Sequence, residues 1–91
     1  MAEIIRADGT TEAVADNLQV KAIAKLIGAE TLDIVNLRDG RFMYLDDLGH
    51  QKELPVNPIA TRLYHTVCKP GTTWPIRGDV VVINDAAGDH G

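Results

Sequence analysis

The chain has 91 residues, with nine basic and thirteen acidic side chains and a formal net charge of −4. A chain of this length has room for one domain, and its hydrophobic fraction of 45% is typical of a folded protein rather than a disordered one. The weak negative charge argues against non-specific nucleic-acid binding, which depends on clustered Lys and Arg. We therefore expect one globular domain that binds no nucleic acid.

The cellular compartment is indicated by cysteine content and by the N-terminus. Cys68 is the single cysteine, so an internal disulfide is impossible and a reducing compartment is expected. The first residues contain neither a basic segment nor a long apolar run, so we expect no signal peptide and no membrane span. These features predict a cytoplasmic protein without a membrane partner.

The first third of the chain predicts one strand and one helix. Residues 2–6 read as a short strand that runs into a turn, and residues 10–16 read as a connection. Asn17 is then a suitable cap for a helix over residues 18–27, where apolar side chains recur at helical spacing. Gly28 supplies the stop signal.

The middle of the chain predicts a hairpin, and the last third predicts a second helix and a strand. Asp39-Gly40 is a strong turn signal between strands at 31–37 and 41–45. Asn57 can cap a helix that begins with Pro58 and ends near residue 65. A long loop over 66–77 follows, and then a continuous apolar run at 80–83 that is typical of a strand covered on both faces.

The predicted order is strand, helix, strand, strand, helix, strand. Such an order favours the α+β class, with one antiparallel or mixed sheet and both helices on one face, as in the two-layer packing of ferredoxin-like domains. We expect this domain to occupy residues 1–85. Residues 86–91 are predicted to form a disordered tail.

No catalytic or metal-binding constellation stands out. The three histidines lie far apart in the sequence, with none of the spacings that zinc sites need. Asp46 and Asp47 are adjacent on a predicted turn, where Asp is favoured for structural reasons. Cys68 has no obvious neighbouring base. The sequence thus predicts no enzyme, no metal and no cofactor.

A binding function is better supported. A capped helix offers an anion-attracting N-terminus, arginines can contact phosphate through two hydrogen bonds, and aromatic rings can stack on a base. The candidate ligand-binding residues are Asn57, Thr61, Arg62, Tyr44, Trp74 and Arg77. Structural explanations stand beside these roles: a helix cap, a solvated helix residue, aromatics at the edge of the core and a plug for the long loop. The same residue types also serve protein interfaces.

Three segments of the chain resemble a known family. The matching segments are Asp39-Gly40-Arg41, Leu54-Pro55-Val56-Asn57-Pro58-Ile59-Ala60-Thr61-Arg62-Leu63 and Gly78-Asp79-Val80-Val81-Val82. The most specific part is the pattern P-x-N-x-x-A-T within the second segment. The chain resembles, from about residue 18 to residue 85, the small bacteriophage and mobile-element proteins catalogued as domain of unknown function 3846.

The resemblance implies a viral or plasmid origin and no established activity. In that setting, a small protein without an active site resembles counter-defence factors that sequester the cyclic nucleotide signals of bacterial immunity, as homo-oligomers in the host cytoplasm. The first hypothesis is therefore a binding module for a nucleotide-type small molecule. The second is a module that binds and inhibits a host protein, and the third is a small hydrolase.

Overall fold

The computed structural model describes the chain except residues 1, 16, 69–70, 72 and 85–91, so the predicted tail lies outside the described residues. It contains a five-stranded antiparallel sheet of order β2-β1-β5-β4-β3 and two helices, which confirms a small single-sheet α+β domain. The elements are β1 (Ala2–Ile5), β2 (Thr11–Val14), α1 (Val20–Ile27), β3 (Leu32–Asn36), β4 (Arg41–Asp46), α2 (Pro58–His65) and β5 (Val80–Asn84).

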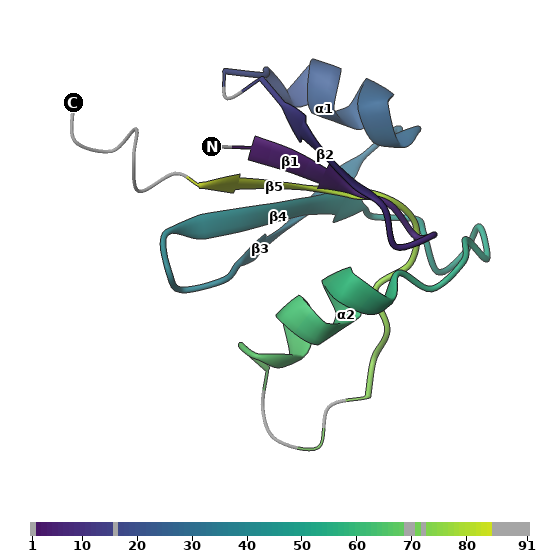
Figure 1. Cartoon of the computed structure of the whole chain (residues 1–91). Coiled ribbons are helices and arrows are strands. Elements are labelled where there is room, and N and C mark those ends of the chain that lie inside the picture. The colour runs from purple at the N-terminus through teal and green to yellow at the C-terminus, as the bar shows by residue number, and fades with distance from the viewer. Residues whose placement is uncertain (1, 16, 69–70, 72, 85–91) are drawn as a thin grey trace.

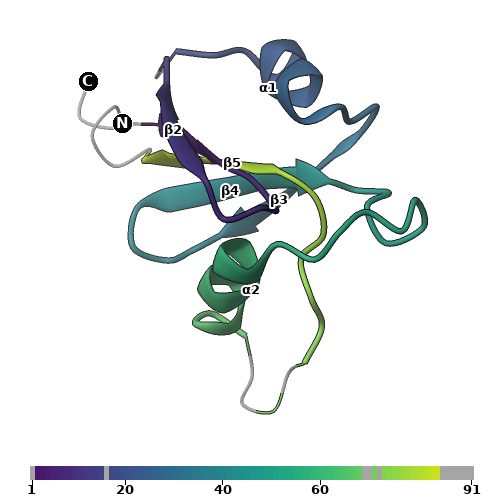
Figure 2. The ribbon, with the colours of Figure 1, turned by 45° about the vertical axis from the view of Figure 1, so that its right-hand side comes forward.

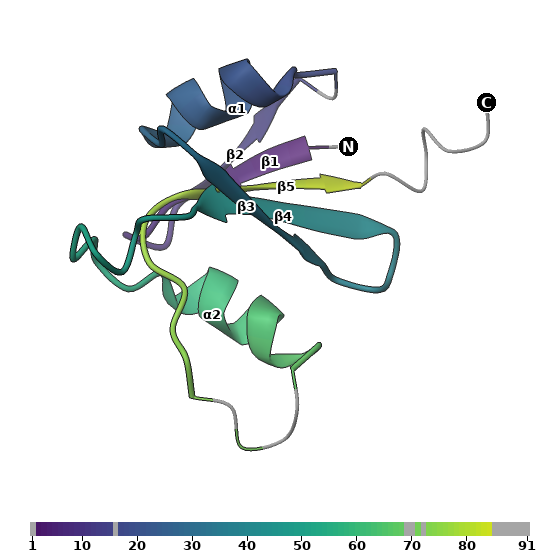
Figure 3. The same cartoon turned by 180° about the vertical axis from the view of Figure 1, so that it is seen from behind.

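The two helices lie on opposite faces of the sheet, with α1 above and α2 below it in Figure 1, and the turned views in Figures 2 and 3 agree. The prediction that both helices share one face was therefore wrong. The central strand β5 explains the difference, since its alternate residues belong to two separate cores. Val80 and Val82 pack in one cluster with Ala60 of α2, whereas Val81 packs in the other with Ile23 of α1.

Strand β2 was missed by the prediction, which treated residues 10–16 as a connection. It pairs antiparallel with β1 along its whole length and forms one edge of the sheet. The turn before it is closed by an N–H···O bond from Gly9 to Arg6 at 2.9 Å, with Gly9 at φ 92°. The backbone N–H and the hydroxyl of Thr10 both donate to Asp8. Asp8-Gly9 is thus a hairpin turn.

Helix α1 begins two residues later than predicted. Its N-cap is Gln19, which makes no side-chain capping bond, so Asn17 is not the cap. Leu18 explains the start, because it precedes the cap and packs in the same cluster as Ile23, four residues into the helix. This is the arrangement of a hydrophobic staple. In the described ranges, neither helix is long and apolar enough to cross a bilayer.

The β3–β4 hairpin follows the predicted Asp39-Gly40 turn, with Gly40 at φ 89°. Asp39 accepts hydrogen bonds from the Arg41 guanidinium, the shortest at 2.8 Å, and from the Arg41 backbone N–H. The side-chain bond from Arg41 is the main reason that the pKa of Asp39 lies below its ordinary value of 3.8. The turn therefore favours the ionised carboxylate.

Asn57 joins α2 to the sheet. Its side chain is fully buried, and its Oδ1 accepts from Ala60 N–H at 3.0 Å, which confirms the predicted cap of a helix that begins at Pro58. Its Nδ2 donates to the carbonyls of Ile5 and Gly78, each at 2.9 Å. One amide thus satisfies three backbone groups from three segments.

We expect Asn57→Ala to lower the free energy of unfolding by about 3–5 kcal/mol. The substitution removes the cap and leaves two buried carbonyls without a donor, each of which carries a desolvation cost. Urea denaturation measures the difference. Asn17→Ala is the matched control: this residue is exposed and caps nothing, so its effect should stay within about 0.5 kcal/mol. Equal losses in both variants would contradict the assignment.

We expect Asp39→Asn to lower the melting temperature at neutral pH, with a difference from the unsubstituted protein that shrinks in acid. A carboxyl whose pKa falls on folding stabilises the folded protein at pH values above its unfolded pKa of 3.8. That contribution disappears as the pH drops through the lower, folded value. Thermal unfolding of both proteins across the acid range measures it. A difference that stays constant with pH would argue against an ionic role for Asp39.

Candidate functional site

The strongest candidate site is a hollow of about 220 Å³ between the β4–α2 connection and the segment before β5. We call it the loop pocket. Its lining combines carboxylates, a histidine, the only tryptophan and an arginine: Asp33, Leu45, Asp46, Asp47, Gly49, His50, Trp74, Pro75, Ile76 and Arg77. The structure thus brings together Trp74 and Arg77, two of the six predicted ligand-binding residues.

Trp74 provides an open aromatic surface in this pocket. Its side chain is 55% exposed, and its ring stacks against His50 with centroids 4.7 Å apart and an interplanar angle of 33°. The backbone is held independently of the ring, because His65 Nε2 lies 2.8 Å from the Trp74 carbonyl oxygen. A half-exposed ring on a backbone held by this contact is a suitable platform for stacking a planar group.

Arg77 is fixed at the other side of the pocket. Its Nη1 donates to the Leu54 carbonyl at 2.9 Å, and its backbone forms an isolated bridge with Val56. Its Nε is buried, and no residue in the described part of the chain accepts its hydrogen. Gly49 permits the close packing here, since a Cβ at that position would lie 3.1 Å from the Arg77 carbonyl oxygen.

The two adjacent aspartates of the pocket differ in role. Asp46 is buried and accepts from Leu48 N–H at 2.8 Å and from Lys52 Nζ at 2.9 Å, so its charge is balanced inside the protein. Asp47 is exposed, as is Asp33. Two solvent-facing carboxylates therefore accompany Arg77, which makes the pocket rich in hydrogen-bond acceptors.

Three of the other predicted residues lie outside the loop pocket, on or beside α2. Asn57 is fully buried and both of its Nδ2 hydrogens are used within the fold. The Thr61 hydroxyl accepts from Ile76 N–H at 2.9 Å and so connects α2 to the segment before β5. Arg62 is exposed on α2. The first turn of this helix has few free donors, because Pro58 has no N–H and the N–H of Ala60 is capped.

Tyr44 lies on the opposite face of the sheet from α2. It belongs to the cluster around α1, beside a separate hollow of about 210 Å³ that is lined by Ile34, Phe42, Tyr44 and Ile83. Ile34 is 51% exposed there. Tyr44 therefore does not converge with Trp74 and Arg77, and its surroundings form an exposed apolar patch.

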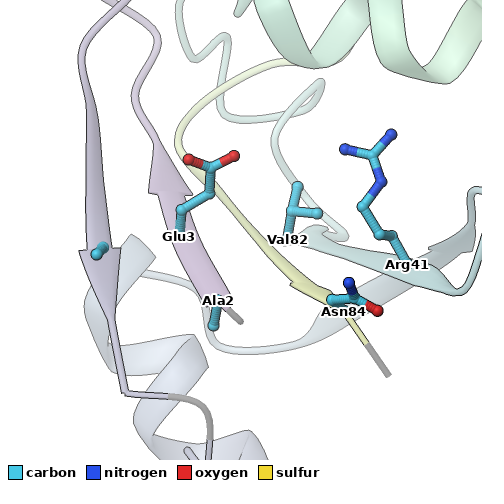
Figure 4. Close-up of a pocket in the computed structure, with 6 residues that line it drawn as sticks. Ala2, Glu3, Arg41, Val82 and Asn84 are labelled. Carbon is cyan, nitrogen blue, oxygen red and sulfur yellow. The ribbon is translucent and has the colours of Figure 1, made fainter. Parts of the chain in front are cut away.

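A third hollow, of about 210 Å³, lies on the α2 side of the sheet at the opposite end from the loop pocket; we call it the sheet-face pocket. Figure 4 shows Glu3, Val82 and Arg41 projecting on the same side of the sheet. Arg41 is already held by Asp39, and this hydrogen bond raises the pKa of its guanidinium. The sheet-face pocket has opposite charges at its rim but no aromatic platform.

His50 is the pocket residue that the sequence did not predict, since it was taken as part of a turn. No local pattern marks it, because its neighbour Trp74 is 24 positions away in the sequence and only the fold brings them together. The structure contains no group of three or more His, Cys, Asp or Glu placed to hold a metal ion, as far as its described residues extend.

Comparison with known proteins gives no further assignment: no family model, no curated protein and no solved structure matches this chain. The resemblance to domain of unknown function 3846 therefore stays a prediction. The case for a function depends on the geometry of the pockets.

We expect Asp46→Asn to destabilise the protein by about 2 kcal/mol, because it removes a charge-assisted hydrogen bond to Lys52 from a buried side chain. Asp47→Asn is the matched control, since the adjacent carboxylate is exposed and its neutral replacement should change stability by less than about 0.5 kcal/mol. Chemical denaturation of both variants measures the difference. Similar losses at the two positions would contradict the separate roles.

Proposed function

We propose that this chain is a non-catalytic binding module that holds the planar base of a nucleotide-derived ligand in the loop pocket. The observation that carries the proposal is the convergence of Trp74, His50 and Arg77 on one hollow. These residues supply a stacking surface and a hydrogen-bond donor, which are the two features that recognise a base.

The charges of the pocket favour the base and sugar of the ligand over its phosphate. Two exposed carboxylates, Asp33 and Asp47, line the same hollow as Arg77 and would repel a phosphate placed among them. The same carboxylates accept hydrogen bonds from the amino and imino groups of a base or from ribose hydroxyls. The Arg77 guanidinium has N–H groups besides the one that donates to Leu54, and such groups suit a ring nitrogen or a carbonyl oxygen.

The volume of the pocket limits what can be enclosed. About 220 Å³ is below the roughly 300–1,000 Å³ of typical ligand pockets. A single base with part of its sugar is the matching size. The phosphates of a larger nucleotide would then lie over the protein surface, in solvent.

The biological role in this proposal is sequestration of a nucleotide-derived host immune signal. Its support is the resemblance to a phage and mobile-element family, together with a pocket suited to holding a ligand. Sequestration requires only tight, reversible binding. The ligand should consequently be recovered chemically intact from the complex.

Titration of the purified protein with mononucleotides and cyclic nucleotides, followed by tryptophan fluorescence, tests the proposal. Trp74 is the only tryptophan, so a change in emission reports on the loop pocket directly. We expect Trp74→Ala to weaken ligand binding by about 1–3 kcal/mol, roughly 5- to 150-fold in Kd, as measured by calorimetry. Trp74→Phe keeps a stacking ring and should retain most of the affinity.

Arg62→Ala is the matched control for the titration. Arg62 is exposed and does not line the loop pocket, so its removal should leave both Kd and the melting temperature unchanged. If Arg62→Ala abolished binding while Trp74→Ala did not, the ligand would lie on α2 and the loop pocket would be the wrong site. Absence of any nucleotide response would reject the proposal altogether.

Protein binding is the second candidate function. The observation that favours it is the exposed apolar patch around Ile34, Phe42, Tyr44 and Ile83, since aromatic side chains in such patches often anchor protein partners. A host protein that co-purifies with the chain, and is lost on Phe42→Asp, would support this function. Turnover of a nucleotide would instead favour the third hypothesis, a small hydrolase.

A further inference from the structure

The two edges of the sheet differ in how well their backbone groups are protected. At the β3 edge, Leu37 N–H donates to Arg41 O at 2.9 Å. Because hydrogen-bonded residues alternate along an antiparallel pair, the backbone groups of the odd-numbered β3 residues bond to β4. The backbone groups of the even-numbered residues point away from the sheet. The central outward N–H is that of Ile34, and the Asp33 carboxylate accepts it at 2.9 Å. A charged side chain that occupies an edge donor blocks the addition of another strand.

The β2 edge has no such protection. Arg6 N–H donates to Thr10 O at 2.8 Å, so the even-numbered residues of β2 face β1. The N–H and C=O groups of Thr11 and Ala13 therefore point away from the sheet. Among the described residues, no hydrogen bond satisfies these groups, and Thr11, Glu12 and Ala13 are all exposed. Unpaired strand edges of this kind are templates for pairing.

We propose that the β2 edge pairs antiparallel with the β2 edge of a second copy of this chain, about a two-fold axis at Ala13. The position of β2 at the edge of the sheet is visible in Figures 1 and 2. Two sheets of five strands then become one sheet of ten. The contacts within each copy are unchanged, because the backbone groups that pair are those that point outward.

The register about Ala13 follows from the side chains. Only odd-numbered residues present their backbone groups outward, and an axis near the middle of the strand passes through Glu12 or Ala13. An axis at Glu12 would place the two Glu12 carboxylates directly opposite each other, which is unfavourable. An axis at Ala13 pairs Thr11 with Ala15 and Glu12 with Val14, and no like charges meet.

A second copy fits this edge better than an unrelated peptide. Strand addition gains specificity from pockets that read alternate side chains of the incoming strand. The β2 edge offers small exposed side chains, Thr11, Ala13 and Ala15, which suit close approach of an identical edge. Glu12 forms an exposed ion pair with Arg6 of its own chain at 2.7 Å.

Pairing at this edge would also join the two sheet-face pockets. Ala13 lines that pocket beside Glu3, its partner in the register of β1 and β2. With the axis at Ala13, the same residue of each copy forms the floor where the pockets meet. One trough would then cross the axis, with a Glu3 on each side of the centre.

Sedimentation equilibrium of the full chain over a series of concentrations tests the pairing. We expect a monomer–dimer equilibrium for the unsubstituted protein and monomer alone for Ala13→Lys, because two lysines would face each other across the axis. Leu26→Lys is the matched control: it makes the same charge change at an exposed site on α1 and should leave the dimer intact. A monomer at every concentration, or a dimer that survives Ala13→Lys, would overturn the proposal.

Cross-linking tests the register by formation of a covalent dimer rather than by loss of association. In a Cys68→Ser background, Ala13→Cys places two thiols on hydrogen-bonded partners about 5.5 Å apart at Cα, within disulfide range. Oxidation should convert this variant to a covalent dimer. Thr11→Cys in the same background should stay monomeric on denaturing gels, since its copies would lie about 13 Å apart. Equal cross-linking at both positions would contradict the proposed axis.

Discussion

The fold depends on one buried amide that serves three segments at once. Asn57 caps α2 through Oδ1 and, through Nδ2, holds the carbonyl at the end of β1 and the carbonyl just before β5. Because a buried carbonyl without a donor is costly, these bonds fix the position of the helix against β1 and the segment that leads into the central strand β5. Arg77 of the loop pocket directly precedes Gly78, one of the two acceptors, so the same amide holds the backbone next to this residue.

The sequence reveals the local elements better than their arrangement. Asn57-Pro58 and Asp39-Gly40 are short-range signals with a direct physical cause, and both mark the elements correctly. The run at 80–83 also indicated a strand covered on both faces, which requires a layer on each side of the sheet. Placing both helices on one face ignored that requirement. Strand β2 is too short to have a periodicity of its own, and only the preceding Asp8-Gly9 turn could have revealed it.

The candidate site could be predicted only in part, because segments that are far apart in the sequence form it together. Residue type identified Trp74 and Arg77 as suitable for a ligand, but nothing local places His50 against the indole. Gly49 allows the two segments to approach, and this contact exists only in the folded chain. Asn57 illustrates the converse: an amide that suits a ribose equally suits a cap, and burial decided between them. Chemistry of a side chain indicates what it can bind, whereas packing determines whether it is free to do so.

The Asp33 carboxylate at the β3 edge has a consequence for how many copies can associate. If both edges were open, β2 of one molecule could pair with β3 of the next, and such head-to-tail contacts continue into fibres unless they close into a ring. If the β3 edge is blocked, each molecule has one strand edge, that of β2, at which another strand can pair. In the proposed dimer, growth would then stop at two copies, because the Asp33 carboxylate occupies a donor at the second edge.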